Sequence, residues 1–334
     1  MFAITGATGH LGQTLLRQIR SRGDRVVAAV RSTSNRSLLS GYADRIDEAP
    51  LHDVDALTAC FDGAEVVIHA AALIDIRRGR RAELDAANVG GTRNVLAACR
   101  RAGVRRLVYM SSIEAFDMSP RRRPIREDFG FARGNACMDY GESKAEASRL
   151  AAAAGLSGEL ETVLIAPTAI VGPWDYQDGP LTTMIRRFLA GKIPAALPGG
   201  FDYVDVRDVA GAVLAAADRG RSGESYLVSG EYLSVADLMT ALERLTGLRG
   251  PRLVLPLPAV RVLAELSESW SRFSGRPALF TRGSVDVLQI DARIDPAKAR
   301  DELGYRPRPI RESLEDTLTW IGEGSAVNPD PLFA

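Results

Sequence analysis

The stretch Thr5-Gly6-Ala7-Thr8-Gly9-His10-Leu11-Gly12 decides the fold class of this 334-residue chain. It follows an apolar, strand-like run and precedes leucines and an isoleucine at helical spacing, so its three glycines lie in a tight turn between a strand and a helix. In such a turn the first glycine permits the bend, the second lets a pyrophosphate approach the backbone, and the third allows close packing of helix on sheet. The turn therefore predicts a dinucleotide bound at the helix N-terminus.

Outward from this turn, short apolar runs alternate with helical patterns as far as residue 166. The expected strands cover residues 2–5, 25–30, 65–70, 106–110 and 161–166. This alternation predicts an α/β fold, a Rossmann-type doubly wound parallel sheet with right-handed crossovers. From Pro167 onward, prolines and glycines become frequent. We therefore expect a cofactor-binding domain over 1–166, to which 201–230 returns, and a smaller C-terminal substrate-binding lobe over 167–334.

Composition narrows the class of protein. The 42 basic and 42 acidic side chains cancel, so no overall charge attracts nucleic acid or an anionic membrane. No apolar run is long enough to span a bilayer, and the first residues enter a strand pattern without a basic leader, so we expect a cytoplasmic protein. Three scattered cysteines and three histidines predict neither a disulfide framework nor a metal site.

The end of the second strand bears on the kind of dinucleotide. An acidic residue there would hydrogen-bond the ribose of NAD and repel a 2′-phosphate. This chain instead has Arg31-Ser32-Thr33, with Arg36 close behind. A guanidinium is a forked cation suited to phosphate, so the sequence predicts NADP(H). The alternative is that Arg31 stacks on the adenine or faces water.

Tyr140 and Lys144 form the second chemical signal, because four residues of helix place a phenol and an ammonium on one face. Moving a tyrosine pKa from about 10 to near 7 takes roughly 4 kcal/mol, which a lysine about 4 Å away supplies at an effective dielectric near 20. A pair of this spacing is common by chance. Ser111-Ser112, at the carboxyl end of the 106–110 strand, strengthens it by adding hydroxyls at the sheet edge where α/β folds bind ligands.

Taken together, these segments resemble the extended short-chain dehydrogenases/reductases, the NAD-dependent epimerase/dehydratase type, over nearly the whole chain. The similar segments are 5–12, 69–72, 88–94, 111–112, 140–144, 166–167, 172–173, 201–208 and 295–307. The apolar substitutions are most similar to the dihydroflavonol-reductase-like and hydroxysteroid-dehydrogenase-like branch. Such proteins are typically homodimers, so a homodimer is a further expectation.

The resemblance implies roles for individual residues. Tyr140 would be the acid/base, Lys144 would bind the nicotinamide ribose and lower the phenol pKa, and Ser112 rather than Ser111 would be the catalytic serine. Asn88 would stabilise a helix rather than relay protons. The implied cofactor-binding residues are Gly6, Thr8, Gly9, His10, Leu11, Gly12, Arg31, Ser32, Arg36, Leu51, His69, Ala70, Ala71, Tyr140, Lys144 and Pro167.

Three functions remain to be compared. The favoured one is NADP(H)-dependent interconversion of a small-molecule ketone or aldehyde and an alcohol. The rival is epimerisation or dehydration of a nucleotide sugar with tightly bound NAD. Against it, Ala166 and Phe201 stand where nucleotide-sugar enzymes of this family usually carry polar residues that hold the substrate. The third, a non-catalytic NADP sensor, is disfavoured because such proteins usually lose the Tyr-Lys pair.

Overall fold

The computed structural model describes residues 1–75, 79–118, 124–134, 136, 138–274 and 293–323. Its main sheet has seven strands in the order β3-β2-β1-β4-β5-β6-β9, and all the pairs between them are parallel. The strands are β1 (Phe2–Thr5), β2 (Val26–Val30), β3 (Arg45–Glu48), β4 (Val66–His69), β5 (Arg106–Met110), β6 (Glu161–Pro167) and β9 (Ser225–Val228). The Rossmann-type fold is confirmed.

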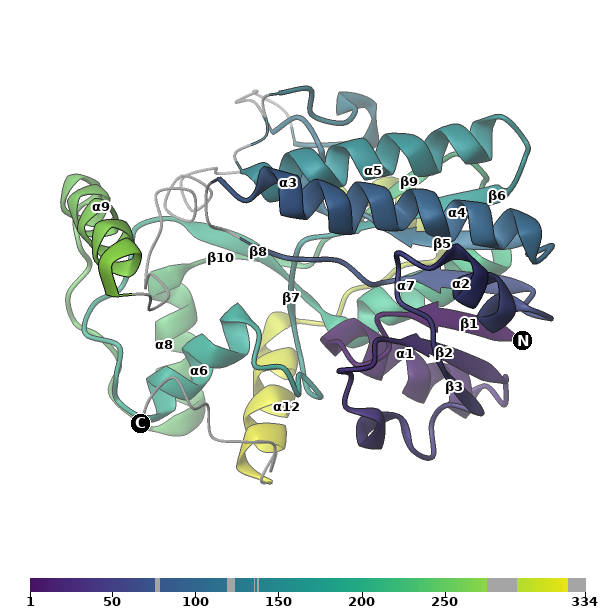
Figure 1. Cartoon of the computed structure of the whole chain (residues 1–334). Helices are drawn as coiled ribbons and strands as arrows, with labels where there is room; N and C mark the ends of the chain where they lie inside the picture. The colour runs from purple at the N-terminus through teal and green to yellow at the C-terminus, as the bar shows by residue number, and fades with distance from the viewer. Residues whose placement is uncertain (76–78, 119–123, 135, 137, 275–292, 324–334) are drawn as a thin grey trace.

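Helices cover both faces of this sheet (Figure 1). One face is packed by α1 (His10–Ser21), α7 (Val206–Arg219) and α11 (Ala297–Leu303), and the other by α2 (Val54–Phe61), α4 (Gly91–Arg101) and α5 (Asp139–Leu156). Successive strand residues point to opposite faces, so Ile4 enters the core under α1 while its neighbour Ala3 enters the core under α2 and α4. Burial on both faces explains why the central strands read as continuous apolar runs.

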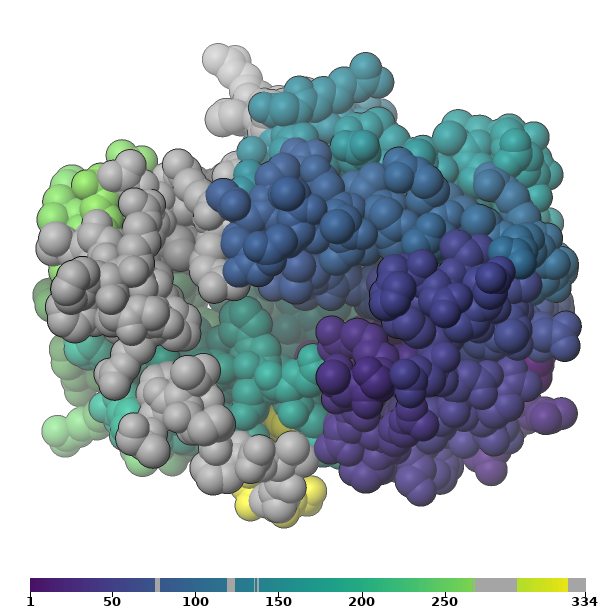
Figure 2. All heavy atoms as spheres, viewed as in Figure 1, coloured from purple at the N-terminus to yellow at the C-terminus, as the bar shows by residue number. Residues whose placement is uncertain are grey.

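The second half of the chain builds a smaller sheet in the order β10-β8-β7. Its strands are β7 (Ala169–Val171), β8 (Gly200–Asp205) and β10 (Glu231–Ser234), and the helices around it are α6 (Pro180–Leu189), α8 (Val235–Thr246), α9 (Leu257–Ser274) and α12 (Ile310–Gly322). Residues 200–230 thus divide between the two sheets, since β8 lies in the smaller sheet while β9 joins the main one. In Figure 2, purple and blue surface from the first part of the chain meets teal surface from its middle at a hollow.

Some elements were not foreseen. β3 reads Arg-Ile-Asp-Glu and is largely exposed, so it carries no apolar alternation that would mark it as a strand. Short helical segments, equally weak in pattern, are η1 (Arg36–Leu39), η3 (Ile113–Ala115) and η4 (Glu127–Phe129). The helical stretch that ends before Gly103 is divided into α3 (Arg81–Leu84), η2 (Asp85–Gly90) and α4. Within the described ranges, every helix is too short or too polar to cross a membrane.

Candidate active site

The glycine turn is tightly built around two of its three glycines. Gly6 has φ +77°, and a Cβ there would lie 2.6 Å from the backbone nitrogen of Ala71. A Cβ on Gly12 would lie 2.1 Å from the carbonyl oxygen of Gly6. At Gly9 the nearest atom would be 3.4 Å away, so the fold itself does not demand a glycine there. Gly9 is also the N-cap of α1 and supplies no capping side chain. The turn thus leaves space and unpaired backbone N–H groups where a pyrophosphate would bind.

The loop after β7 closes onto this turn. His10 Nε2 lies 3.0 Å from the carbonyl oxygen of Pro173, and the Gln177 amide donates to the carbonyl oxygen of Thr8 at 3.2 Å. Burial lowers the pKa of His10, so the ring is neutral and its Nε2 carries the proton donated to Pro173. Trp174, in the same loop, adopts the left-handed region with φ 71°. These contacts join the glycine turn to the smaller lobe.

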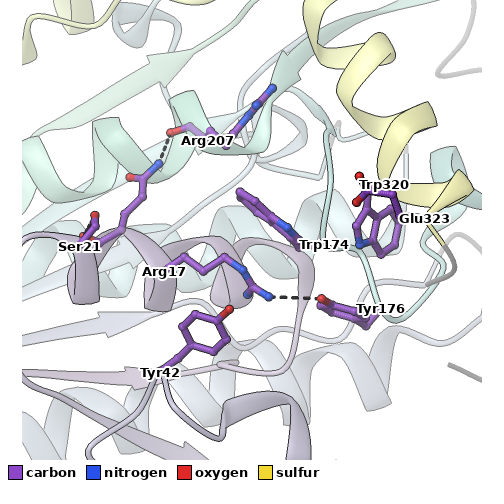
Figure 3. A pocket seen from close by; sticks show the side chains of 9 residues that line it. Arg17, Ser21, Tyr42, Trp174, Tyr176, Arg207, Trp320 and Glu323 are labelled. Carbon is purple, nitrogen blue, oxygen red and sulfur yellow. Dashed lines mark hydrogen bonds between the residues drawn. The ribbon is translucent and has the colours of Figure 1, made fainter. Parts of the chain in front are cut away.

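A cleft of about 660 Å³ lies beside the same loop (Figure 3). Arg17 of α1 projects among aromatic rings there, 4.3 Å from the ring centre of Tyr42 and 4.9 Å from that of Trp174. Its guanidinium also donates to the Tyr176 hydroxyl at 3.2 Å. None of the predicted site residues lines this cleft. The arginine is already paired by the protein, so its contacts fasten the loop to α1.

The predicted 2′-phosphate residues follow β2. Arg31 and Ser32 are exposed, and the Arg31 backbone N–H donates to Ser34 Oγ at 3.1 Å. Arg36 forms an ion pair with Glu48 at 2.8 Å, so a carboxylate already neutralises part of its charge. For Arg31, the described part of the chain provides no ion pair. Of the two arginines, Arg31 is therefore the better cation for a phosphate.

His69, Ala70 and Ala71, predicted to bind the cofactor, lie at the end of β4 directly against the glycine turn, where the Ala70 N–H donates to the Thr5 carbonyl. The His69 ring points into the protein, with Nδ1 2.7 Å from Thr5 Oγ1 and Nε2 3.3 Å from Thr92 Oγ1. Burial and the nearby charge of Lys144 lower the pKa of His69 to about 3, so this ring is neutral. The Leu51 carbonyl accepts a hydrogen bond from the Asn94 side-chain amide at 2.8 Å, and Pro167 lies at the end of β6 in register with Val228 of β9.

Tyr140 lies in the first turn of α5 and its side chain is buried. Burial and the charge of Glu114 raise the phenol pKa, while a hydrogen bond with the Ser112 side chain lowers it. Ser111 is turned away, with its hydroxyl 2.7 Å from that of Ser148. The structure therefore brings Ser112, and not Ser111, to the phenol. In this environment the phenol is protonated at neutral pH.

Lys144 corrects one expectation. The helical spacing predicts its ammonium beside the Tyr140 phenol, as the group that lowers the pKa of that phenol. The structure gives the ammonium two other hydrogen-bond acceptors, the Tyr109 hydroxyl at 2.9 Å and the Met110 carbonyl oxygen. Burial lowers the pKa of Lys144 to about 7. Helical spacing shows which residues share a face of α5, but not that β5 presents a second phenol to the same lysine.

Two polar residues complete the site. Glu114 follows Ser112 by two residues, and burial raises the pKa of its carboxyl to about 7. Glu114 is not among the residues predicted from the sequence, although a carboxylate just after the two serines is a visible signal. Asn88 binds the backbone of Leu73 and the Ser143 hydroxyl, which agrees with a stabilising role. Among the residues described, no cluster of His, Cys, Asp or Glu is arranged to hold a metal.

The raised pKa of the Glu114 carboxyl predicts that the stability of the protein falls as the pH rises. Its carboxyl titrates near pH 4.5 when unfolded and near 7 when folded, so its stabilising contribution is complete below pH 4.5 and lost as the pH rises through 7. Glu114→Gln removes this loss. We expect the variant to match the wild type at low pH and to exceed its unfolding free energy by up to about 3 kcal/mol at pH 8. Denaturant unfolding from pH 4 to 8 measures the difference.

The control for this prediction is Glu231→Gln on β10, where the side chain is exposed. This substitution removes an exposed carboxylate. The unfolding free energy of the variant should follow that of the wild type at every pH. A Glu114→Gln variant that loses stability between pH 5 and 8 as steeply as the wild type would contradict the assignment.

Comparisons with known proteins agree with this geometry. A model of the NAD dependent epimerase/dehydratase family matches residues 2–229. The chain is 36% identical over 322 residues to sterol demethylase protein B of Methylococcus capsulatus, covering 96% of this chain and 98% of that protein. It is 31% identical to a putative dihydroflavonol 4-reductase of Synechocystis, covering 96% and 94%. It is 28% identical to a 3 beta-hydroxysteroid dehydrogenase/Delta 5-->4-isomerase of Mycobacterium tuberculosis, covering 91% and 85%. The crystal structure of gox2253 superposes with a TM-score of 0.85 at 29% identity, covering 98% of this chain and 99% of that one.

Proposed function

This chain belongs to the NAD dependent epimerase/dehydratase family, whose members use NAD or NADP, and on that premise we propose that it is an NADP(H)-dependent oxidoreductase interconverting a ketone or aldehyde and an alcohol. The observation that carries the proposal is the buried, protonated phenol of Tyr140 with Ser112 beside it, on the sheet edge that also holds the glycine turn. A phenol kept protonated at neutral pH is suited to donate a proton to a carbonyl oxygen as it is reduced.

Each residue of the site has a separate task in this reaction. Ser112 hydrogen-bonds the carbonyl oxygen and holds it at the phenol. When bound, NADPH would supply the hydride from its nicotinamide. Tyr140 donates its proton to the oxygen as negative charge develops there. Lys144, on the same helix, would hold the nicotinamide ribose, while two of its N–H donors bind the Tyr109 hydroxyl and the Met110 carbonyl.

Two positions support reduction over nucleotide-sugar epimerisation. Ala166 is fully buried in the core beneath α5, and Phe201 lies edge-on to Tyr203 with ring centres 6.1 Å apart. Neither side chain can donate a hydrogen bond, and a diphosphate buried without donors is costly. The rival is tested directly: turnover of UDP- or dTDP-sugars without net change in NADPH absorbance would favour the epimerase.

The names of the relatives suggest the substrate class. They include sterol demethylase protein B, a 3 beta-hydroxysteroid dehydrogenase/Delta 5-->4-isomerase and a putative dihydroflavonol 4-reductase. We therefore propose a ring ketone or secondary ring alcohol on an apolar skeleton. A panel of steroids, flavonoids, simple aldehydes and nucleotide sugars, followed by absorbance at the NADPH maximum and by product chirality, tests this. A homodimer remains a prediction for sedimentation analysis.

Arg31→Ala tests the coenzyme preference. Loss of a charge-assisted contact to the 2′-phosphate should lower kcat/KM with NADPH by about 10- to 100-fold and leave that with NADH nearly unchanged. Arg36→Ala is the matched comparison and should have a smaller effect, because Arg36 is paired with Glu48. Equal efficiency of NADH and NADPH in the wild type would refute the preference itself.

A further inference from the structure

Tyr109 is a buried phenol that the proposed reaction leaves without a task. It lies on β5, one residue before Met110, and only 1% of its surface is exposed. Its side chain faces α5, where its oxygen accepts a hydrogen bond from Lys144 Nζ at 2.9 Å. The lysine nitrogen also lies 4.4 Å from the centre of the phenol ring.

The number of N–H donors on Lys144 limits how many groups its ammonium can bind. An ammonium has three N–H donors and no acceptor. One goes to the Tyr109 oxygen and one to the Met110 carbonyl, which leaves a single N–H. We propose that Tyr109 is a positioning residue that, together with the Met110 carbonyl, seats the Lys144 ammonium so that one N–H remains for the dinucleotide. The role given to the remaining N–H rests on the proposed function, whereas the contacts of Lys144 with Tyr109 and Met110 do not depend on it.

The surrounding hydrogen bonds orient the phenol for this task. Thr92 donates its own proton to the Asn88 carbonyl at 2.6 Å, so toward Tyr109 and His69 the Thr92 oxygen acts as an acceptor. The Tyr109 hydroxyl interacts with the hydroxyls of Thr92 and Ser148. Its proton is therefore directed away from Lys144, and its lone pairs are directed toward the ammonium.

The choice of a phenol has an electrostatic consequence. A carboxylate at this position would form an ion pair and cancel the lysine charge, whereas a neutral oxygen accepts the hydrogen bond and leaves the net positive charge in place. The other titratable groups of the site are His69 on β4, which the lysine charge reaches, Tyr140 on the lysine's own helix, and Glu114 on η3, whose charge acts on Tyr140. Burial keeps the phenols and His69 neutral at neutral pH, since it raises the pKa of both tyrosines and, with the lysine charge, lowers that of His69.

The chain allows a direct test because its only lysines are Lys144, Lys192 and Lys298. Protein labelled with ¹³Cε-lysine should show three resonances, assigned by Lys192→Arg and Lys298→Arg. Titration of the full chain then gives the pKa of Lys144. Tyr109→Phe removes one acceptor from the ammonium and should lower this pKa by about 1–2 pH units. Tyr305→Phe is the matched control: its phenol is also buried but donates to the Ser229 carbonyl, and Lys144 should titrate as in the wild type.

A second variant covers the case in which Tyr109→Phe does not fold. Ser148→Ala keeps the phenol but removes one of its partners, and it should shift the Lys144 pKa in the same direction by less. An unchanged Lys144 titration in the variants that fold overturns the proposal.

Activity supplies an independent readout. In Tyr109→Phe the apparent pKa of the alkaline limb of the kcat–pH profile should be lower by the same 1–2 pH units. If Tyr109 had only a structural role, the substitution would lower kcat equally at every pH. A wild type that reduces no carbonyl would refute the proposed function alone, because the lysine titration needs no substrate and still decides whether Tyr109 seats the ammonium.

Discussion

Replacing Tyr140 by phenylalanine should lower kcat by about 10²- to 10⁴-fold, the range that a positioned general acid contributes. Phenylalanine keeps the buried ring and removes only the hydroxyl, so α5 should fold as before. NADPH affinity, measured by fluorescence titration, should stay within about threefold of the wild-type value, because the glycine turn and the Lys144 hydrogen bonds do not involve this hydroxyl. Steady-state kinetics with the substrate found in the panel measures the loss.

The contrast with the serines makes this prediction specific. Ser112→Ala should also reduce kcat, since Ser112 hydrogen-bonds the phenol, while Ser111→Ala should have a much smaller effect because that hydroxyl is bound to Ser148. Unchanged turnover in Tyr140→Phe would remove the phenol from the reaction. An equal loss in both serine variants would instead point to a disturbed β5 end.

Substitutions in the glycine turn should distinguish the glycine needed for stability from the glycine needed only for NADPH binding. In Gly12→Ala the new methyl would lie 2.1 Å from the Gly6 carbonyl oxygen, so α1 must move away from the sheet. We expect a loss of about 1–3 kcal/mol in unfolding free energy, and no NADPH binding. In Gly9→Ala the methyl meets nothing closer than 3.4 Å, so the free protein should keep its stability while NADPH affinity falls by at least about tenfold.

Thermal unfolding with and without NADPH measures both effects, because a ligand that binds the folded state raises the melting temperature. Gly23→Ala is a useful comparison: its Cβ would meet no atom within 4 Å, but its φ of +78° is strained for any other residue. It should lower stability and leave the melting shift on NADPH addition intact. A full NADPH-induced shift in Gly9→Ala would show that the phosphates do not approach the backbone there.

Much of the fold was predictable because its signals are local. Strands β1 and β5 were predicted with their observed bounds, since apolar runs and flanking turn residues mark them. β3 was missed because an exposed strand of Arg, Ile, Asp and Glu is held by pairing with β2 and not by its own burial. The smaller sheet was foreseen only as a separate lobe, since 28 residues of chain separate β7 from β8 and 25 separate β8 from β10.

By itself, the sequence determined the glycine turn, the helix face shared by Tyr140 and Lys144, and the serines at the end of β5, because each depends on spacing within one strand, turn or helix. Only the tertiary structure decided which groups these side chains meet. It brought Lys144 to Tyr109, bound the Ser111 hydroxyl to Ser148, and placed the half-buried Glu114 where its charge acts on Tyr140. The physical reason is that hydrogen-bond partners and desolvation are set by packing between β5 and α5, which lie about 30 residues apart in the chain and are juxtaposed only when the sheet is covered.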